Sequence, residues 1–167
     1  YKGFVRTGAN LNEDKKSELR IIDAELCKLK IKFGENVLAE TNKFELHLTR
    51  KSQIKGLPDS AIEAAGLTAK QKEKEGWIFT LDYPSYVPFM TYADDRELRK
   101  KMALAFGSKA FQNNKFDNQQ IVLDLVNTRY KRATLLGYKS HSHFVLEERM
   151  AEKPENVITF LNDLLVK

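Results

Sequence analysis

The chain has 167 residues, of which 42% are hydrophobic, 10% aromatic and 31% charged, and it contains only 8 Gly and 4 Pro. This composition is typical of one globular domain with a well-solvated surface, and it argues against long loops and low-complexity segments. The formal charge of +5 comes from interspersed acids and bases without a basic block, and no apolar run approaches the roughly 20 residues of a membrane span, so we expect neither a nucleic-acid nor a membrane partner.

The first residues and the single cysteine further limit the class of protein and its compartment. The chain opens on Tyr1, not Met, and shows no charged-then-apolar leader. We therefore expect a segment of a longer protein without a signal peptide, in the cytoplasm, with the periplasm as the alternative. Cys27 is the only cysteine, which excludes an intrachain disulfide framework and a Cys-based zinc site. Its position between Leu26 and Leu29 predicts a buried structural thiol.

A long helix is the first element that the pattern predicts. Asn12 is placed as its N-cap, and Glu13 and Asp14 in the first turn complement the helix dipole. The helix continues to Thr41 and Asn42, and its apolar face is predicted from three- and four-residue spacing of Leu19, Ile22, Leu26, Leu29, Phe33 and Val37.

Two short strands with a helix between them come next. Residues 44–48 alternate apolar and polar side chains, with His47 facing outward, and residues 77–81 are rich in aromatic and β-branched types. Between them, Pro58 is tolerated at the start of a helix. Gly66 is predicted to stop that helix, and Thr68 to cap one further turn.

The second half of the chain is predicted to be helical. Residues 83–90 are Pro-dense and are predicted as a connection that turns into a helix, with Ser85 placed as its cap. Asp94 with Glu97, and Asp117 with Gln120, are spaced as capping boxes. The apolar stripes that follow these boxes are predicted as core and consist of Leu98, Met102, Ala105 and Phe106, then Ile121, Leu125, Tyr130 and Ala133.

The last two helices follow a glycine stop at Gly137. Ser140 is placed to cap a helix that carries Phe144, Val145 and Met150, and Pro154 begins the final one. That final helix has an apolar stripe of Val157, Phe160, Leu161, Leu164 and Leu165, which is likewise predicted as core. The expected fold class is mainly α, a multi-helix single domain over residues 1–167 with a small two-stranded β element.

The residues themselves indicate no active site. His141 and His143 lie two residues apart on a predicted helix, so their side chains point to nearly opposite faces and cannot coordinate the same metal ion. No HExxH motif occurs. There is no Gly-x-Ser-x-Gly elbow and no phosphate-binding glycine loop. The adjacent acids Glu147-Glu148 and Asp94-Asp95 are interpreted as surface charges, because neighbours on a helix do not face each other.

Four arginines at helical spacing leave two interpretations open. Arg96, Arg99, Arg129 and Arg132 either form salt bridges or line a groove, and salt bridging is the default expectation. We therefore predict no catalytic and no metal-binding residue in this chain, and the substrate-binding residues remain unknown.

A series of short motifs runs in order along nearly the whole chain. The motifs are Phe4-Val5-Arg6 with Gly8-Ala9, residues 33–38 with 40–42, Gly56-Leu57-Pro58, residues 77–81, residues 84–90 with Tyr92-Ala93, residues 96–99, Asp117-Asn118, residues 133–138 and Met150-Ala151. Each motif is weak alone, but their collinear order is specific. Together they resemble the thimet oligopeptidase family of zinc peptidases and look closest to its dipeptidyl carboxypeptidase (peptidyl-dipeptidase) branch. The Ser140–His143 run departs from the pattern, which more often has Ala or aromatic residues there.

The resemblance implies a large helical enzyme in which a zinc ion, held by HExxH and a more distant Glu, activates water to cleave short peptides. None of those ligands lies here, so the resemblance places this chain upstream of the zinc helix, as part of the wall of the substrate channel. The implied parent releases dipeptides from peptide C-termini and uses zinc, whereas this segment binds none. Its partners are then short peptides and the missing catalytic portion of the same chain. A free-standing helical protein-interaction module is the alternative.

Overall fold

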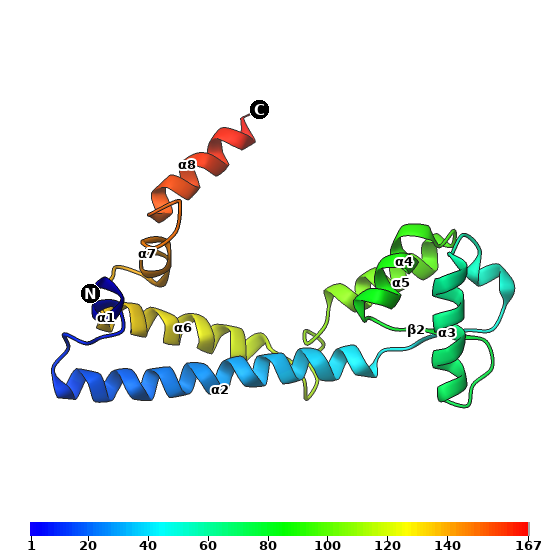
Figure 1. The fold of residues 1–167 in the computed structure, drawn as a ribbon, viewed down its shortest axis with the longest axis horizontal. Helices are drawn as coiled ribbons and strands as arrows, with labels where there is room; N and C mark the ends of the chain where they lie inside the picture. Colours follow the sequence, from blue (N-terminus) through cyan, green and yellow to red (C-terminus); the bar gives the residue numbers. More distant parts are fainter. Residues whose placement is uncertain (167) are drawn as a thin grey trace. The chain divides into compact units, whose positions relative to one another are not determined.

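The computed structural model describes residues 1–166, and its architecture is mainly α-helical (Figure 1). Within these residues there are eight α-helices, one 3-10 helix and one sheet of two antiparallel strands, which confirms the predicted fold class. The elements are α1 (Lys2–Arg6), α2 (Glu13–Lys43), β1 (Leu46–Leu48), η1 (Lys51–Ile54), α3 (Asp59–Gln71), β2 (Trp77–Phe79), α4 (Tyr83–Tyr92), α5 (Arg96–Gly107), α6 (Gln119–Leu135), α7 (His141–Leu146) and α8 (Pro154–Leu165).

The chain divides into two compact units by its contacts. Unit 1 comprises Tyr1–Phe33 with Gln120–Lys167, and unit 2 comprises Gly34–Gln119. Helix α2 therefore begins in unit 1 and ends in unit 2. The sequence-based assignment of a single domain over residues 1–167 stays a prediction, since it concerns whether the chain unfolds as one cooperative body.

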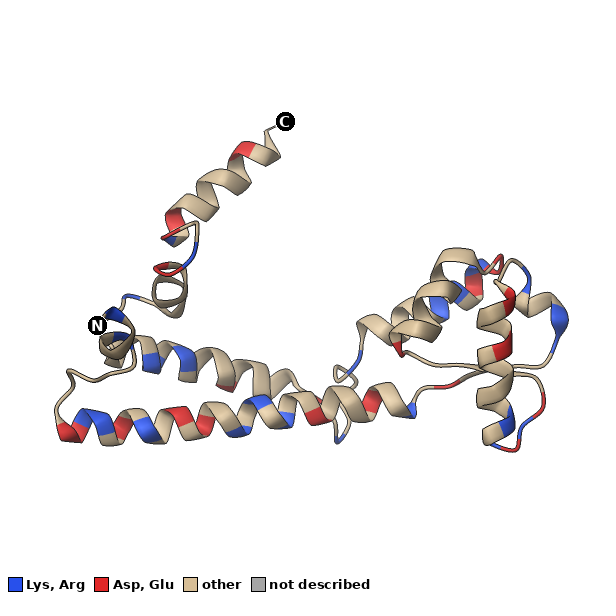
Figure 2. Ribbon diagram, in the orientation of Figure 1, with Lys and Arg blue, Asp and Glu red and all other residues tan. Residues whose placement is uncertain are grey.

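Unit 1 is built around the contact between α2 and α6, which lie side by side in Figure 1. Helix α2 begins where the sequence predicts, because the Asn12 side-chain oxygen accepts a hydrogen bond from the backbone N–H of Lys15 at 3.0 Å. Figure 2 shows positive and negative charges interspersed along α2. The apolar contact between α2 and α6 consists of buried Ile22, Leu26 and Leu125, with Leu29, Ile121 and Leu135 packed against them.

Helix α6 ends at the predicted glycine. Gly137 has a φ of +86°, which is the left-handed region that favours glycine. The backbone N–H of Gly137 donates to Thr134 O at 2.9 Å, and that of Tyr138 donates to Ala133 O at 2.9 Å. This pair of bonds is the Schellman motif, which satisfies the last carbonyls of the helix and turns the chain toward α7.

Unit 2 has its own, larger core around the two-stranded sheet. Strands β1 and β2 pair antiparallel, with Leu46 opposite Phe79 and Leu48 opposite Trp77. Helices α3 and α4 pack on β2, and the Phe79 and Phe89 rings meet edge-to-face with centroids 4.7 Å apart. The buried core comprises Leu46, Leu48, Ile54, Leu57, Ala65, Phe79, Leu81, Phe89, Ala93 and Met102. A two-stranded ribbon is marginal alone, so these helices supply the apolar cover that it needs.

A buried polar contact ties the end of α2 into unit 2. The Asn36 side-chain amide donates to the side-chain oxygen of Asn118 at 2.8 Å, and both residues are almost inaccessible to solvent. Because an unpaired buried amide is costly, this contact fixes the register between α2 and the segment before α6.

Helix α3 is longer than predicted. It continues through Gly66 to Gln71, so Gly66 is not a stop and Thr68 is not a cap; the Thr68 hydroxyl donates to Ala64 O within the helix at 2.9 Å. A glycine inside a helix costs about 1 kcal/mol. Packing against β2 offsets that cost, since the Gly66 position lies next to the Trp77 ring and Ala65 and Ala69 are buried.

Two predicted caps are shifted from their places. Asp95, not Asp94, caps α5, and its carboxylate accepts from the backbone N–H groups of Glu97 and Leu98. Asp82 is the N-cap residue of α4, and the Ser85 hydroxyl instead accepts from the Thr80 N–H at 2.9 Å. Helix starts predicted from sequence are accurate only to one or two residues, so a neighbouring residue can take the cap position.

Asp117 also has a different role from the predicted capping box. Its carboxylate accepts from the backbone N–H groups of Gln112, Asn113 and Gln119. These three bonds hold the pKa of Asp117 below its usual value, the bond from Gln119 first. Asp117 therefore closes the loop before α6, while the Gln120 side chain bonds Asp124 on the same helix.

The predicted burial of Tyr130 and of Cys27 is wrong, and α7 ends earlier than predicted. Tyr130 is 55% exposed, because it lies five residues, or about 140°, round the helix from Leu125. Thr128 is buried in its place. Cys27 is exposed, because it lines an open cavity beside α6 and is not part of the packed contact. Met150 lies beyond the end of α7 and is fully exposed, since α7 already ends at Leu146.

Helix α8 begins at Pro154 as predicted, but its apolar stripe does not form core. Phe160, Leu161 and Leu164 are each more than half exposed, and the helix carries only acids, Glu155 and Asp163, as charged residues. Among residues 1–166 nothing covers this stripe, so its assignment to the core is wrong. No helix within these residues is long and apolar enough to span a membrane.

Candidate functional site

The three histidines were the first candidates for chemistry, and their environments differ. His47 faces outward on β1, as predicted, and its Nε2 is 2.7 Å from Glu75 O. His143 Nδ1 is 2.7 Å from the Ser140 hydroxyl, and its Nε2 is 3.4 Å from a Glu155 carboxylate oxygen. Ser140 is also the N-cap of α7, as predicted. Two of the histidines are therefore accounted for by local contacts.

His141 is the histidine without such a contact. Its Nδ1 is buried and has no hydrogen-bond partner among the described residues. Burial lowers the pKa of His141, and the positive charges of Arg129, Arg132 and Lys30 lower it further. Burial and the neighbouring cations therefore favour the neutral imidazole of His141.

The described residues do not fit the zinc ion that the resemblance implies. Within residues 1–166, no three His, Cys, Asp or Glu side chains converge as metal ligands, and a zinc site needs at least three protein ligands in one place. No catalytic step through zinc can be derived from this chain.

The four arginines divide between the two interpretations. Arg132 forms the predicted salt bridge, with its Nε 2.6 Å from Asp23. Arg99 donates to the carbonyl oxygens of Ala93 and Asp94 just before α5, and Arg96 lies beside it at a cavity of about 200 Å³. Arg129 forms no ion pair among the described residues and lines a groove instead.

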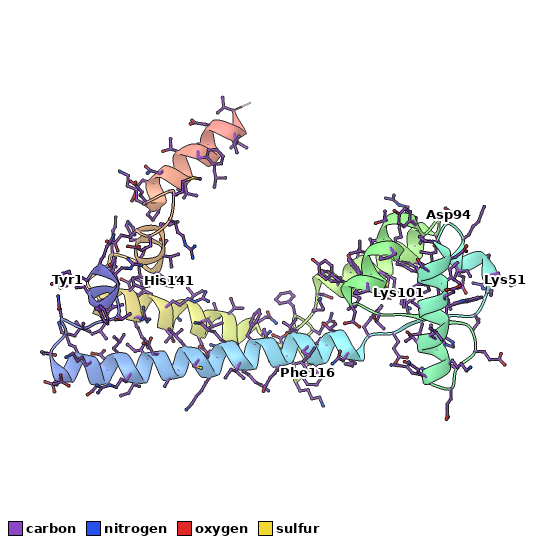
Figure 3. The ribbon with its side chains drawn as sticks, in the orientation of Figure 1. Tyr1, Lys51, Asp94, Lys101, Phe116 and His141 are labelled. Carbon is purple, nitrogen blue, oxygen red and sulfur yellow. The ribbon has the colours of Figure 1, made fainter. Side chains whose placement is uncertain are left out.

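The groove lies on unit 1, where α2 and α6 run side by side and α7 contributes His141, labelled in Figure 3, to the lining. Its larger part is a cavity of about 420 Å³ whose positive residues are Lys30, Arg129 and Arg132, with His141 beside them. The Leu26 and Phe144 side chains supply apolar wall. The Arg132 guanidinium also lies 5.1 Å from the centroid of the Phe144 ring, a distance at which a cation and an aromatic face attract.

A smaller, apolar cavity of about 260 Å³ continues the groove along the same two helices. It shares Lys30 and Arg129 with the larger cavity, and Phe33, Val122 and Val126 line it. The groove therefore has a cationic part and an apolar part that meet at Lys30 and Arg129.

Helix α7 is held in place by Arg6 of α1. The guanidinium donates to Phe144 O at 2.7 Å and to the Tyr138 hydroxyl at 3.2 Å, and it pairs with Glu147. It also lies 4.4 Å from the centroid of the Phe144 ring. Since the Arg6 side chain is only 12% exposed, these contacts fix α7 and thereby the positions of His141 and Phe144 at the groove.

The adjacent acids have structural roles, which fits their interpretation as surface charges. Glu147 pairs with Arg6, and Glu148 pairs with Lys2 at 2.8 Å. Asp95 caps α5, and Asp94 lies 3.9 Å from the Lys55 ammonium. Neither acidic pair is arranged as a general acid and base facing one space.

The sequence offered no signal for Lys30 as a site residue. It lies among charged residues on the long helix, and only the pairing of α2 with α6 brings it to the same cavity as Arg129. The position of Arg129 at a groove was one of the two alternatives that the helical spacing of the arginines left open.

Comparison with known proteins gives a consistent assignment. Residues 89–167 match the sequence profile of Peptidase family M3. The chain is 35% identical to Oligopeptidase A of Salmonella typhimurium over 98% of the chain and 25% of that protein. It is 37% identical to the probable cytosolic oligopeptidase A of Arabidopsis thaliana over 94% of the chain and 24% of that protein.

A dipeptidyl carboxypeptidase is also similar to the chain, at lower identity. The enzyme of Escherichia coli is 26% identical over 99% of the chain and 24% of that protein. The chain thus spans about a quarter of the length of the curated relatives it matches. These findings show similarity to oligopeptidases and to the profile of Peptidase family M3. They do not specifically support the dipeptidyl carboxypeptidase branch.

Proposed function

We propose that this chain is a non-catalytic segment of a zinc-dependent oligopeptidase of Peptidase family M3. The observation that carries the proposal is the similarity to oligopeptidases A over 94–98% of the chain, joined to the family match over residues 89–167. The zinc, its water and the general base would come from the remaining three quarters of the parent.

The segment's own role is structural in this proposal. It forms part of the wall of the substrate channel, and its exposed apolar stripe on α8 packs against the missing portion of the same polypeptide. The large exposed side chains of α8 support this role, because a folded monomer rarely leaves such a stripe uncovered. The substrates are short peptides.

Release of dipeptides from peptide C-termini is a second candidate for the parent. The similarity to a dipeptidyl carboxypeptidase favours it, but at 26% identity it is weaker than the similarity to the oligopeptidases. The two candidates differ in their products, because a peptidyl-dipeptidase releases successive C-terminal dipeptides while an oligopeptidase cleaves internal bonds.

The test is to purify the full-length parent and analyse its products by mass spectrometry on a short peptide with a free or an amidated C-terminus. We expect internal cleavage of both peptides and loss of activity with a chelator. A ladder of dipeptides from the free C-terminus alone would favour the second candidate. Chelator-resistant activity would overturn the proposal.

A free-standing interaction module is the rival class, and the exposed stripe of α8 also suits it. In that case a parent with a catalytic portion would not exist, and no longer form of the protein would hydrolyse peptides. The compartment of the parent stays a prediction, cytoplasmic with periplasmic as the alternative.

A further inference from the structure

The groove between α2 and α6 has more positive than negative charge. Arg132 is paired with Asp23 through its Nε. Lys30 and Arg129 form no ion pair or hydrogen bond through their side chains among residues 1–166. Two positive charges therefore remain beside one another in a concave site, where an anion is attracted more strongly than on a flat surface.

The state of His141 is a second sign that these charges converge. Its ring lines the same cavity, and the charges that lower its pKa after burial are those of Arg129, Arg132 and Lys30. Three cations from two helices thus act on the His141 ring and line the same cavity. An anion placed there would offset their mutual repulsion.

The apolar half of the groove selects among anions. Val122, Val126 and Phe33 line the cavity that meets the cationic one at Lys30 and Arg129. An inorganic anion would leave this half unused, and a nucleic-acid backbone needs a series of cations, which the interspersed surface charges do not provide. A carboxylate next to an apolar side chain matches both halves.

We propose that the α2–α6 groove binds the C-terminal residue of a peptide, with its α-carboxylate at Lys30 and Arg129 and its apolar side chain against Val122 and Val126. The α-carboxylate accepts hydrogen bonds from both cations, as charge-assisted pairs do. The choice of a peptide as the ligand rests on the proposed function, whereas the carboxylate chemistry rests on the groove alone.

The test is a calorimetric titration of the purified chain with N-acetyl-leucine, N-acetyl-leucinamide and sulfate. We expect N-acetyl-leucine to bind, the uncharged amide not to bind, and sulfate to bind at least about tenfold more weakly, because it has no apolar group. Equal affinity for N-acetyl-leucinamide would show that the carboxylate is not recognised, which contradicts the proposal. Equal binding of sulfate would make the site a general anion site and overturn the proposal.

Variants locate the site. The double variant Lys30→Gln with Arg129→Gln should lower the affinity for N-acetyl-leucine by about tenfold or more, since each substitution removes a charged hydrogen-bond donor. Lys131→Gln is the matched control, because Lys131 is exposed on α6 and lines neither cavity. An equal loss in the control, with helical circular dichroism unchanged in all proteins, would show a nonspecific charge effect and refute the site.

An NMR titration of the His141 ring is an independent readout. The groups around it are Asp23 and Lys30 of α2, and Arg129 and Arg132 of α6. N-acetyl-leucine should raise the pKa of His141, because a carboxylate stabilises the imidazolium, and N-acetyl-leucinamide should not. An unchanged His141 pKa at saturating N-acetyl-leucine would place the ligand elsewhere. If this chain binds N-acetyl-leucine but the full-length parent does not hydrolyse peptides, the proposed function is refuted and the carboxylate site still holds.

Discussion

At the scale of single residues, the fold of unit 1 depends on few buried side chains. Among the described residues, the apolar contact between α2 and α6 centres on buried Ile22, Leu26 and Leu125, and Leu19 and Ala133 of this unit are also buried. Leucines on either side of α6 therefore differ sharply in environment, because Leu125 is 8% exposed and Leu123 is 57% exposed. Burial, rather than residue type, decides what each contributes to stability.

Leu125→Ala should lower the free energy of unfolding by about 2–4 kcal/mol, through lost apolar contact and the cavity left between α2 and α6. The measurement is urea denaturation followed by circular dichroism. Leu123→Ala is the matched control on the same helix and should change the free energy of unfolding by less than about 0.5 kcal/mol. Equal effects of the two substitutions would mean that α2 and α6 do not pack as described.

Glu45 should make stability depend on acid pH. Hydrogen bonds from Lys72 first, then from Lys74, lower the pKa of Glu45 to about 2. A lowered pKa in the folded state gives stability that is present above the usual value of 4.5 and is lost as pH falls from there toward about 2. Because the pair is near the surface, Glu45→Gln should cost less than about 1 kcal/mol at pH 7.

The measurement is the unfolding midpoint of wild type and of Glu45→Gln between pH 7 and pH 2. The difference between them should shrink as pH falls through that window. Glu63→Gln is the control, since Glu63 is exposed and pairs with no cation among the described residues. A constant difference across the window would contradict the ion pairs of Glu45.

At the scale of elements, helix ends follow local chemistry closely. The Asn12 and Ser140 side chains accept from backbone N–H groups at the starts of α2 and α7, and Pro154 opens α8. Gly137 ends α6 in the left-handed conformation. Each of these interactions lies within a few residues in sequence, so each can be read from the sequence alone.

Gly137→Ala should destabilise unit 1 by about 1 kcal/mol, because an alanine is strained at a φ of +86°. Gly34→Ala is the control in the interior of α2, where a Cβ would meet nothing within 4 Å. That substitution should be neutral or stabilise by up to about 1 kcal/mol. Thermal unfolding followed by circular dichroism measures both, and a stabilising Gly137→Ala would contradict the Schellman motif.

At the scale of the whole molecule, the exposed stripe of α8 is the main feature that the chain leaves uncovered. Phe160 and Leu164 are one turn apart on one face and are 61% and 52% exposed. In the proposed parent this face packs against the remainder of the polypeptide. In the isolated chain it is available to dyes and to other copies.

The isolated chain should therefore bind a hydrophobic dye and self-associate more than an ordinary monomer does. Phe160→Ser with Leu164→Ser should reduce both dye fluorescence and the associated fraction in sedimentation by at least about half. Leu67→Ser on α3, which removes one exposed apolar side chain, should change neither much. Unchanged association in the double variant would show that another surface mediates self-association.

The isolated chain should not bind zinc tightly and should not hydrolyse peptides, since water activation needs a metal held by at least three ligands with one position open. Calorimetry with zinc is the measurement, and the full-length parent is the positive control. One stoichiometric site of micromolar affinity in this chain, lost in His141→Gln with His143→Gln, would overturn the prediction. Zinc-dependent dipeptide release by the chain alone would do so as well.

Periodicity and capping predict most of the helices, the two strands and several helix ends, because both act between residues at most four or five apart; α1 is not among the predicted helices. The resemblance to a peptidase family is likewise visible in the sequence. Which faces are covered depends on tertiary packing: Cys27 and Tyr130 are exposed, α3 continues through Gly66, and the stripe of α8 is uncovered among the described residues. The groove belongs to this second group, because Lys30 and Arg129 are about a hundred residues apart and meet only when α2 packs on α6. Whether a side chain is buried depends on which element packs against it, and the local sequence pattern does not specify that element.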